Sequence, residues 1–129
     1  MGGNILVVEN EPNIQEALAL VFEDSFKLSM AASAEEALAT PPEAAEAVGV
    51  IFLDGDLGPG LSGDEALPFF LQRFPQASIV YIGSLGPLKA AALKAAGVSI
   101  MLPKPWLVAP LKQLRDAAVK GLSLRRLRT

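Results

Sequence analysis

Side chains that could carry out chemistry follow four short apolar runs of the chain. They are three carboxylates, an amide, a hydroxyl and a lysine, and in chain order they are Glu9, Asn10, Asp54, Asp56, Ser84 and Lys104. If the runs are parallel strands, these side chains gather at one edge of a sheet, because sites in such sheets form at the carboxyl ends of the strands. Carboxylates that close repel one another and need a cation to stay ionised together. Oxygen donors on a partly hydrated site favour Mg2+ or Mn2+.

Such a cluster indicates phosphoryl transfer. A bound divalent ion can neutralise the oxygens of an incoming phosphoryl group. An ionised aspartate can then attack phosphorus and form an acyl phosphate. A lysine can pair with the phosphoryl group as a point charge, and a serine hydroxyl can donate a hydrogen bond to one of its oxygens. This chemistry requires all of these groups to meet, so it depends on the elements that carry them.

The apolar runs alternate with segments of helical periodicity. Strands are predicted at Asn4–Val8, Lys27–Ala31, Val48–Leu53, Ser78–Ile82 and Val98–Leu102. Helices are predicted at Pro12–Asp24, after Ser33, after Ser62, at Pro87–Ala96 and from Val108 to about Leu124. Buried strands that alternate with helices indicate a parallel sheet covered on both faces. We therefore predict an α/β fold, a single doubly wound (βα)5 domain with a five-stranded parallel sheet, as in flavodoxin.

Several helix ends carry local signals. Ser33 and Ser62 each stand three residues before a glutamate, which is the pattern of a capping box. Gly97 follows an alanine-rich segment and is the kind of residue that ends a helix. Pro68 lies inside the segment after Ser62, so that helix is expected to start late or to kink near its N-terminus. The stretch Glu43–Ala47 is compatible with a helical turn or with a loop.

Composition restricts the class of protein. The 129 residues suffice for one domain, with a core expected at about 4–122 and a basic tail or linker at 123–129. Neither cysteine nor histidine is present. Their absence excludes disulfides, thiolate nucleophiles, Ser-His-Asp catalysis and a phosphohistidine donor. No apolar run approaches the length of a membrane span and the N-terminus lacks a signal-peptide pattern, so a cytoplasmic protein is expected.

Three segments carry a resemblance to a known family. They are ILVVENEP (Ile5–Pro12), VIFLDGDLGPGLSGDEAL (Val50–Leu67) and AAGVSIMLPKPW (Ala95–Trp106). Together they resemble the receiver domains of response regulators in bacterial two-component systems, the CheY-like superfamily, in order and over nearly the whole chain. The resemblance implies a single receiver domain over residues 1–129, in which phosphorylation of one aspartate switches a protein-interaction surface.

The resemblance assigns roles to individual residues. Asp54 matches the phosphoacceptor, and Lys104 matches the lysine that contacts the phosphoryl group. The positions that match the metal site of the family are Glu9, Asn10, Asp54 and Asp56. Of these, Asp56 would bind the metal through its backbone carbonyl. Ser84, or alternatively Gly83, matches the switch threonine or serine.

The sequence departs from the family pattern at several positions. The acidic pair is usually two aspartates, whereas Asn10 offers an oxygen without a charge, which lowers the expected metal affinity. The loop after Asp54 is one residue longer than the commonest form. The loop after the fourth predicted strand is shorter, which leaves open whether Gly83 or Ser84 is the switch residue. Met101 stands where an aromatic switch residue is common.

Three other functions compete with this one. A pseudo-receiver would keep the fold and bind a partner without phosphorylation, and Asn10 with the altered switch positions favours it. The segment Phe52–Asp56 also resembles the strand signature of haloacid-dehalogenase-type phosphatases. That family needs further acids late in the chain, where only Asp116 follows Glu65. A flavodoxin-like nucleotide binder would need a glycine-rich phosphate loop after the first strand, and the sequence has none there.

The resemblance also implies partners. The phosphodonor would be a sensor histidine kinase or a phosphotransfer protein, and the signal would pass to a downstream effector or to an output domain. A receiver accepts a phosphoryl group onto its own aspartate. An enzyme that turns over a separate substrate is therefore not expected. A homodimer could form through Pro87–Ala96, Val98–Leu102 and the last predicted helix. The basic tail has three arginines without an aromatic platform, so direct nucleic-acid binding is not expected. Membrane binding is not expected either, because no apolar run is long enough to span a bilayer.

Overall fold

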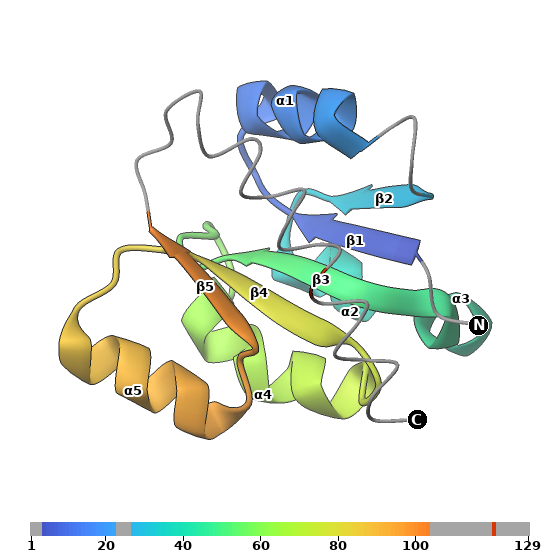
Figure 1. Cartoon of the computed structure of the whole chain (residues 1–129). Coiled ribbons are helices and arrows are strands. Elements are labelled where there is room, and N and C mark those ends of the chain that lie inside the picture. Colours follow the sequence, from blue (N-terminus) through green and yellow to red (C-terminus); the bar gives the residue numbers. More distant parts are fainter. Residues whose placement is uncertain (1–3, 23–26, 104–119, 121–129) are drawn as a thin grey trace.

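A five-stranded parallel sheet forms the centre of the molecule (Figure 1). The computed structural model describes residues 4–22, 27–103 and 120. The strands are β1 (Asn4–Val8), β2 (Leu28–Ala31), β3 (Val48–Asp54), β4 (Ser78–Gly83) and β5 (Ile100–Pro103). Their order in the sheet is β2-β1-β3-β4-β5, and every neighbouring pair is parallel. The predicted doubly wound sheet, with the first and third strands side by side, is confirmed.

Helices lie on both faces of this sheet. They are α1 (Pro12–Phe22), α2 (Ala34–Leu38), α3 (Pro42–Ala47), α4 (Gly63–Arg73) and α5 (Pro87–Ala96). α1 lies over one face, and α2, α4 and α5 lie over the other (Figure 1). The helix predicted from Val108 to about Leu124 falls outside the described residues, apart from the helical Lys120, and so does the tail at 123–129.

Alternation along the strands divides the core into two layers. Phe52 of β3 packs in the layer that contains Phe22 of α1, and their ring centroids are 5.3 Å apart. Leu53, the next residue, belongs to the opposite layer together with Phe70 of α4. Every residue of β3 is buried, as expected of a central parallel strand covered on both faces. Asp54 is therefore presented from a fully buried strand of the sheet.

Two serines identified in the sequence cap helices. Ser62 Oγ accepts a hydrogen bond from the Glu65 amide at 3.0 Å, and the Glu65 carboxylate accepts one from the Ser62 amide at 3.1 Å. Ser33 Oγ likewise accepts from the Glu36 amide at 3.0 Å. The Glu36 carboxylate, however, accepts from the Ala32 amide. The capping box is thus complete at the start of α4 and displaced by one residue at the start of α2.

α4 runs through Pro68 and starts without delay. It begins at Gly63, directly after Ser62, so the expectation of a late start is wrong. Pro68 removes one amide donor that would otherwise reach the Asp64 carbonyl. The complete capping box and the buried apolar face of the helix compensate for that single lost hydrogen bond.

The remaining element ends agree closely with the sequence pattern. Gly97 ends α5 in the left-handed conformation, with φ of 115°. The stretch Glu43–Ala47, which is compatible with a helical turn or a loop, forms most of α3. β5 begins at Ile100 and not at Val98. No helix in the described part of the chain has the length and apolar character needed to span a bilayer.

Candidate functional site

Two buried carboxylates stand at the carboxyl ends of neighbouring strands. β1 and β3 pair with Val8 opposite Leu53, so the next residues, Glu9 and Asp54, reach the same edge of the sheet. Each is 1% exposed. Burial of two carboxylates side by side is unfavourable unless charge or hydrogen bonds compensate it. The strand order therefore places two buried carboxylates at this edge, where positive charge or hydrogen bonds must compensate their burial.

The backbone after Asp54 turns back onto its side chain. The Asp56 amide donates to Asp54 Oδ1 at 2.9 Å. The Gly55 amide donates to the Ile82 carbonyl of β4 at 2.8 Å. The Asp54 carboxylate is thus oriented by the loop that follows it, and that loop is tied to β4. Asp56 itself is exposed.

Glu9 is fixed at the junction of β1 and α1. Its Oε1 accepts a hydrogen bond from the Glu11 amide at 3.1 Å. Its carbonyl accepts one from Gln15 Nε2 at 2.5 Å. Its own amide donates to the Ala31 carbonyl of β2 at 3.0 Å. Both the backbone and the side chain of Glu9 are therefore held in place.

Asn10 holds the loop that follows Asp54. Its Nδ2 donates to the Gly58 carbonyl at 3.1 Å. An aspartate could not make this contact, because an ionised carboxylate has no N–H to donate. Asparagine at this position therefore removes one negative charge from the site and adds a contact to the loop.

Glu35 of α2 holds the same loop further along. Its Oε2 accepts a hydrogen bond from the Leu61 amide at 2.8 Å. Gly60, with φ of 101°, lies against the same carboxylate, and a Cβ there would be 2.8 Å from Oε2. The Leu61 hydrogen bond is the main reason that the pKa of Glu35 lies below its ordinary value of 4.5. The loop between β3 and α4 is thus anchored at two points by Asn10 and Glu35.

We expect Glu35→Gln to loosen this loop. A neutral amide oxygen accepts a weaker hydrogen bond than a carboxylate does, so the Leu61 amide should exchange faster with solvent. Because the pKa of Glu35 is lowered on folding, its stabilisation is present above about 4.5 and is lost as the pH falls through the lower folded value. NMR amide exchange and a pH titration of the Leu61 signal measure these effects, with the exposed Glu43→Gln as control. Unchanged Leu61 exchange would contradict the role of Glu35.

Gly63 lets the start of α4 pack directly on the end of β3. The Gly63 amide donates to the Gly55 carbonyl at 3.1 Å. A Cβ at Gly63 would lie 2.0 Å from the Asp54 carbonyl oxygen. The position of Asp54 is therefore set by backbone packing as well as by hydrogen bonds.

The two candidate switch positions differ in burial. Gly83 is the last residue of β4, is buried, and pairs with Pro103 of β5. Ser84 follows it and is exposed. A glycine thus occupies the end of the strand, and the switch role of Ser84 stays a prediction. Lys104 comes after the end of β5 in the sequence and lies outside the described residues.

The oxygen donors at this edge suit a hard divalent cation. The carboxylates of Glu9 and Asp54 and the backbone carbonyl of Asp56 are ligand types that Mg2+ and Mn2+ prefer. Within residues 4–22, 27–103 and 120, no group of three or more carboxylate, histidine or cysteine side chains is arranged to hold a metal. A cation bound here would therefore complete its coordination with backbone oxygen and water, which Mg2+ commonly retains.

Three residues that the sequence analysis did not single out make contacts next to Asp54 and its loop. Tyr81 Oη donates to Asp64 Oδ1 at 2.5 Å, and Lys89 Nζ lies 2.8 Å from Asp64 Oδ2. Burial, followed by the Asp64 hydrogen bond, raises the pKa of Tyr81 to about 12. Alternation along β4 could have assigned Tyr81 to a face of the sheet. No sequence pattern pairs it with residues from two helices.

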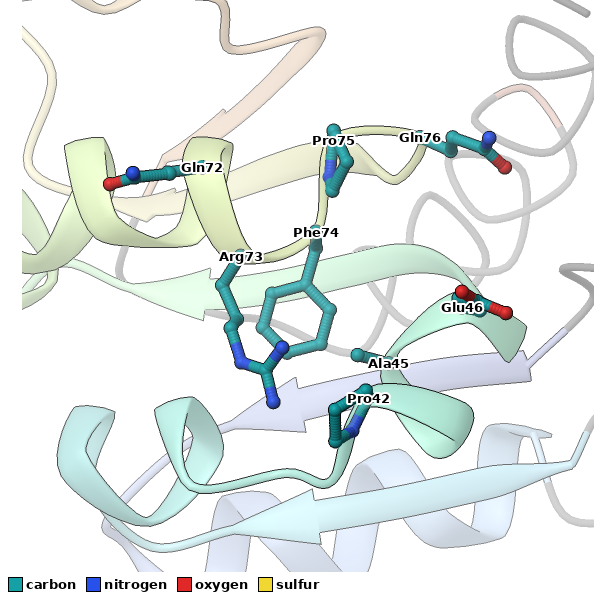
Figure 2. Close-up of a pocket in the computed structure, with 8 residues that line it drawn as sticks. All are labelled: Pro42, Ala45, Glu46, Gln72, Arg73, Phe74, Pro75 and Gln76. Carbon is teal, nitrogen blue, oxygen red and sulfur yellow. The ribbon is translucent and has the colours of Figure 1, made fainter.

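A pocket of about 630 Å3 lies near the ends of the sheet where β3 and β4 begin, away from Asp54. Figure 2 shows the residues that line it. Its lining comes from α3, the end of α4 and the turn before β4: Pro42, Ala45, Glu46, Gln72, Arg73, Phe74, Pro75 and Gln76. Arg73 there donates a hydrogen bond to the Thr40 carbonyl. These segments precede β3 and β4, whereas Asp54 stands where β3 ends. The pocket is therefore not part of the candidate site.

Known proteins resemble this chain over nearly its whole length. The nitrogen assimilation regulatory protein NtrX of Azorhizobium caulinodans is 33% identical over 98% of this chain and 28% of that protein. The crystal structure of NtrX from Brucella abortus matches with a TM-score of 0.76 and 27% identity, over 98% of this chain and 29% of that chain. A CheY-like response regulator receiver domain protein from Methanospirillum hungatei matches with a TM-score of 0.82 and 19% identity, over 100% of both chains. No protein-family model matches.

These findings agree with the motifs and with the fold. The Methanospirillum structure shares the fold described above. The NtrX similarity adds sequence identity along the same stretch, although this chain spans only 28% of the length of that relative. The chain therefore has the fold of CheY-like receiver domains, and it is similar in sequence to the part of NtrX that it spans.

Proposed function

We propose that this chain is a receiver domain that accepts a phosphoryl group on Asp54 with the help of Mg2+. The observation that supports the proposal most directly is the burial of Asp54 beside Glu9, at the carboxyl ends of β3 and β1. The Asp56 amide orients the Asp54 carboxylate at 2.9 Å. A divalent cation would both relieve the repulsion between the two carboxylates and attract a phosphoryl group.

In the proposed transfer, a carboxylate oxygen of Asp54 forms a bond to phosphorus while the bond between phosphorus and the donor breaks. With a phosphohistidine donor the P–N bond breaks and the imidazole nitrogen takes up a proton. With acetyl phosphate a P–O bond breaks and acetate leaves. Bound Mg2+ supplies positive charge for the phosphoryl oxygens. The chain orients the nucleophile through the Asp56 amide and holds the loop through Asn10 and Glu35.

The partners in this proposal follow from the chemistry and from the relatives. A sensor histidine kinase or a phosphotransfer protein would donate the phosphoryl group in the cytoplasm. The NtrX relative is a longer regulatory protein, which supports an output domain or a downstream effector as the recipient of the signal. A homodimer through α5, β5 and the last predicted helix stays a prediction.

Intact-mass spectrometry after incubation with Mg2+ and acetyl phosphate tests the proposal. We expect one phosphoryl adduct on the parent chain and none when EDTA removes the metal. Asp54→Asn, which keeps the shape of the side chain but removes the nucleophile, should give no adduct. Asp56→Asn is the matched control, because it changes a neighbouring carboxylate and leaves the backbone carbonyl in place, so its adduct should persist. An adduct that survives Asp54→Asn would place the acceptor elsewhere.

A second function, that of a pseudo-receiver binding module, is supported by two residues. Asn10 contributes no charge and donates to Gly58, and Gly83 has no hydroxyl at the end of β4. A parent chain that gives no adduct, and whose Asp56 amide signal does not respond to Mg2+, would favour this function. A phosphatase of the haloacid-dehalogenase type has less support, because a receiver domain structure matches the whole chain.

A further inference from the structure

Tyr81 is the only tyrosine of the chain, and it lies in β4 with 1% of its surface exposed. Its ring packs in the core layer that contains Leu53 and Phe70. Its hydroxyl donates to Asp64 Oδ1 at 2.5 Å. A buried tyrosine hydroxyl requires a partner. A carboxylate is a stronger acceptor than a neutral group, so this hydrogen bond fixes the end of the ring.

Asp64 connects the tyrosine to a second helix. It lies in the first turn of α4, and its Oδ2 is 2.8 Å from Nζ of Lys89 in the first turn of α5. The same Nζ lies 5.5 Å from the centroid of the Tyr81 ring, within the range of a cation–π contact. The Lys89 and Asp64 side chains are 40% and 42% exposed, so as an isolated surface pair they would contribute little. The hydrogen bond from the buried Tyr81 hydroxyl to Asp64 gives the Lys89–Asp64 ion pair a defined geometry.

Tyr81 also fills the space beside two glycines of the candidate site. A Cβ at Gly55, the residue after Asp54, would lie 2.0 Å from the tyrosine hydroxyl oxygen. A Cβ at Gly83, the last residue of β4, would lie 3.0 Å from the tyrosine ring. The hydroxyl end of Tyr81 is therefore enclosed between the backbone of the Asp54 loop and the end of its own strand. A shift of the Gly55 backbone would press directly on it.

We propose that Tyr81, Asp64 and Lys89 form a latch that ties the first turn of α5 to the Asp54 loop, so that α5 responds to the chemical state of Asp54. The signal at Asp54 rests on the proposed function, whereas the latch contacts do not. Close-packed groups pass a displacement on to their neighbours because there is no free volume to absorb it. Leu88, which is 89% exposed, lies in the same turn of α5. The latch would therefore control how an apolar side chain is presented to a partner.

Backbone amide exchange in the full chain tests the latch without any ligand. Tyr81→Phe removes the hydroxyl and keeps the ring, and Lys89→Met removes the charge. The Ala90 amide, which donates to the Gly86 carbonyl at 2.8 Å, should exchange roughly five-fold faster in each variant, as expected for the loss of one hydrogen bond. The double variant should be no faster than either single variant. Lys94→Met, an exposed lysine in the last turn of the same helix, should match the parent.

Addition of Mg2+ and beryllofluoride, a mimic of the phosphoryl group, tests the transmission. We expect the Asp56 amide signal to respond alike in the parent and in Tyr81→Phe, and the Ala90 signal to respond only in the parent. A tyrosine with a merely structural role would leave the Ala90 response intact. An Ala90 response in Tyr81→Phe equal to that of the parent, or unchanged exchange without ligand, would overturn the latch. If Asp56 of the parent does not respond, the proposed function fails and the ligand-free exchange alone decides on the latch.

Discussion

Gly63→Ala is expected to destabilise the fold by about 3 kcal/mol, at the upper end of the usual cost of overpacking. Alanine is normally the better residue in a helical turn, by up to about 1 kcal/mol, so propensity alone predicts stabilisation. The added Cβ, however, would lie 2.0 Å from the Asp54 carbonyl oxygen and 2.8 Å from Gly55 Cα. Both are backbone atoms at the end of a buried strand and cannot rotate away. α4 or the Asp54 loop must therefore move.

Urea unfolding measures this effect, and Gly58→Ala in the same loop is the control. A Cβ at Gly58 meets nothing within 4 Å, so that variant should stay within about 0.5 kcal/mol of the parent. Gly63→Ala should also slow the formation of the phosphoryl adduct, because the clash displaces Asp54. A Gly63→Ala protein as stable as the parent would mean that α4 is free to move away from β3.

Phe70→Ala is expected to lower the free energy of unfolding by about 3–5 kcal/mol, as is typical when a buried phenylalanine is truncated. Phe70 is fully buried, at 0% exposed, in the layer between α4 and the sheet. Its ring stacks on Phe74 with 5.8 Å between centroids. Its removal would leave a cavity beneath the helix that carries Asp64 and packs on Asp54, and the surrounding close packing fills such a cavity only in part.

The neighbouring residue supplies the control for Phe70→Ala. Phe69 lies on the same helix and is 52% exposed. Phe69→Ala makes the same chemical change without a buried cavity, so it should cost less than about 1 kcal/mol. The urea midpoint should fall for Phe70→Ala with little change in slope, since the surface exposed on unfolding is nearly the same. Equal losses for the two variants would contradict the assignment of Phe70 to the core.

The order of strands and helices could be read from the chain because each depends on nearby residues. β3 is a short, uninterrupted apolar run, and every one of its residues is buried. Ser62 with Glu65 and Gly97 carry helix ends that are fixed by contacts a few residues apart. Pro68 predicted a late start or a kink, and the late start was wrong, because the buried face and the capping box of α4 outweigh one lost hydrogen bond.

The location of the site followed from the same local patterns. Once β1 and β3 are recognised as buried parallel strands, the residues after them must reach one edge, and Glu9 and Asp54 do so. The chemical types of these residues then indicate the chemistry. Their roles in phosphoryl transfer are predictions that the mass measurement decides.

The sequence by itself therefore determined the order of the strands along the chain, the helix ends at Ser33, Ser62 and Gly97, and the edge at which the carboxylates gather. Only the tertiary structure decided that Asn10 reaches Gly58, that Ser84 is exposed, and that Tyr81 meets Asp64. The physical reason is how far apart in the chain the interacting residues lie. Local periodicity and capping are set by neighbours in the chain, whereas these contacts depend on strand register and on how α4 and α5 pack against β4. No pattern within one segment of the chain carries that information.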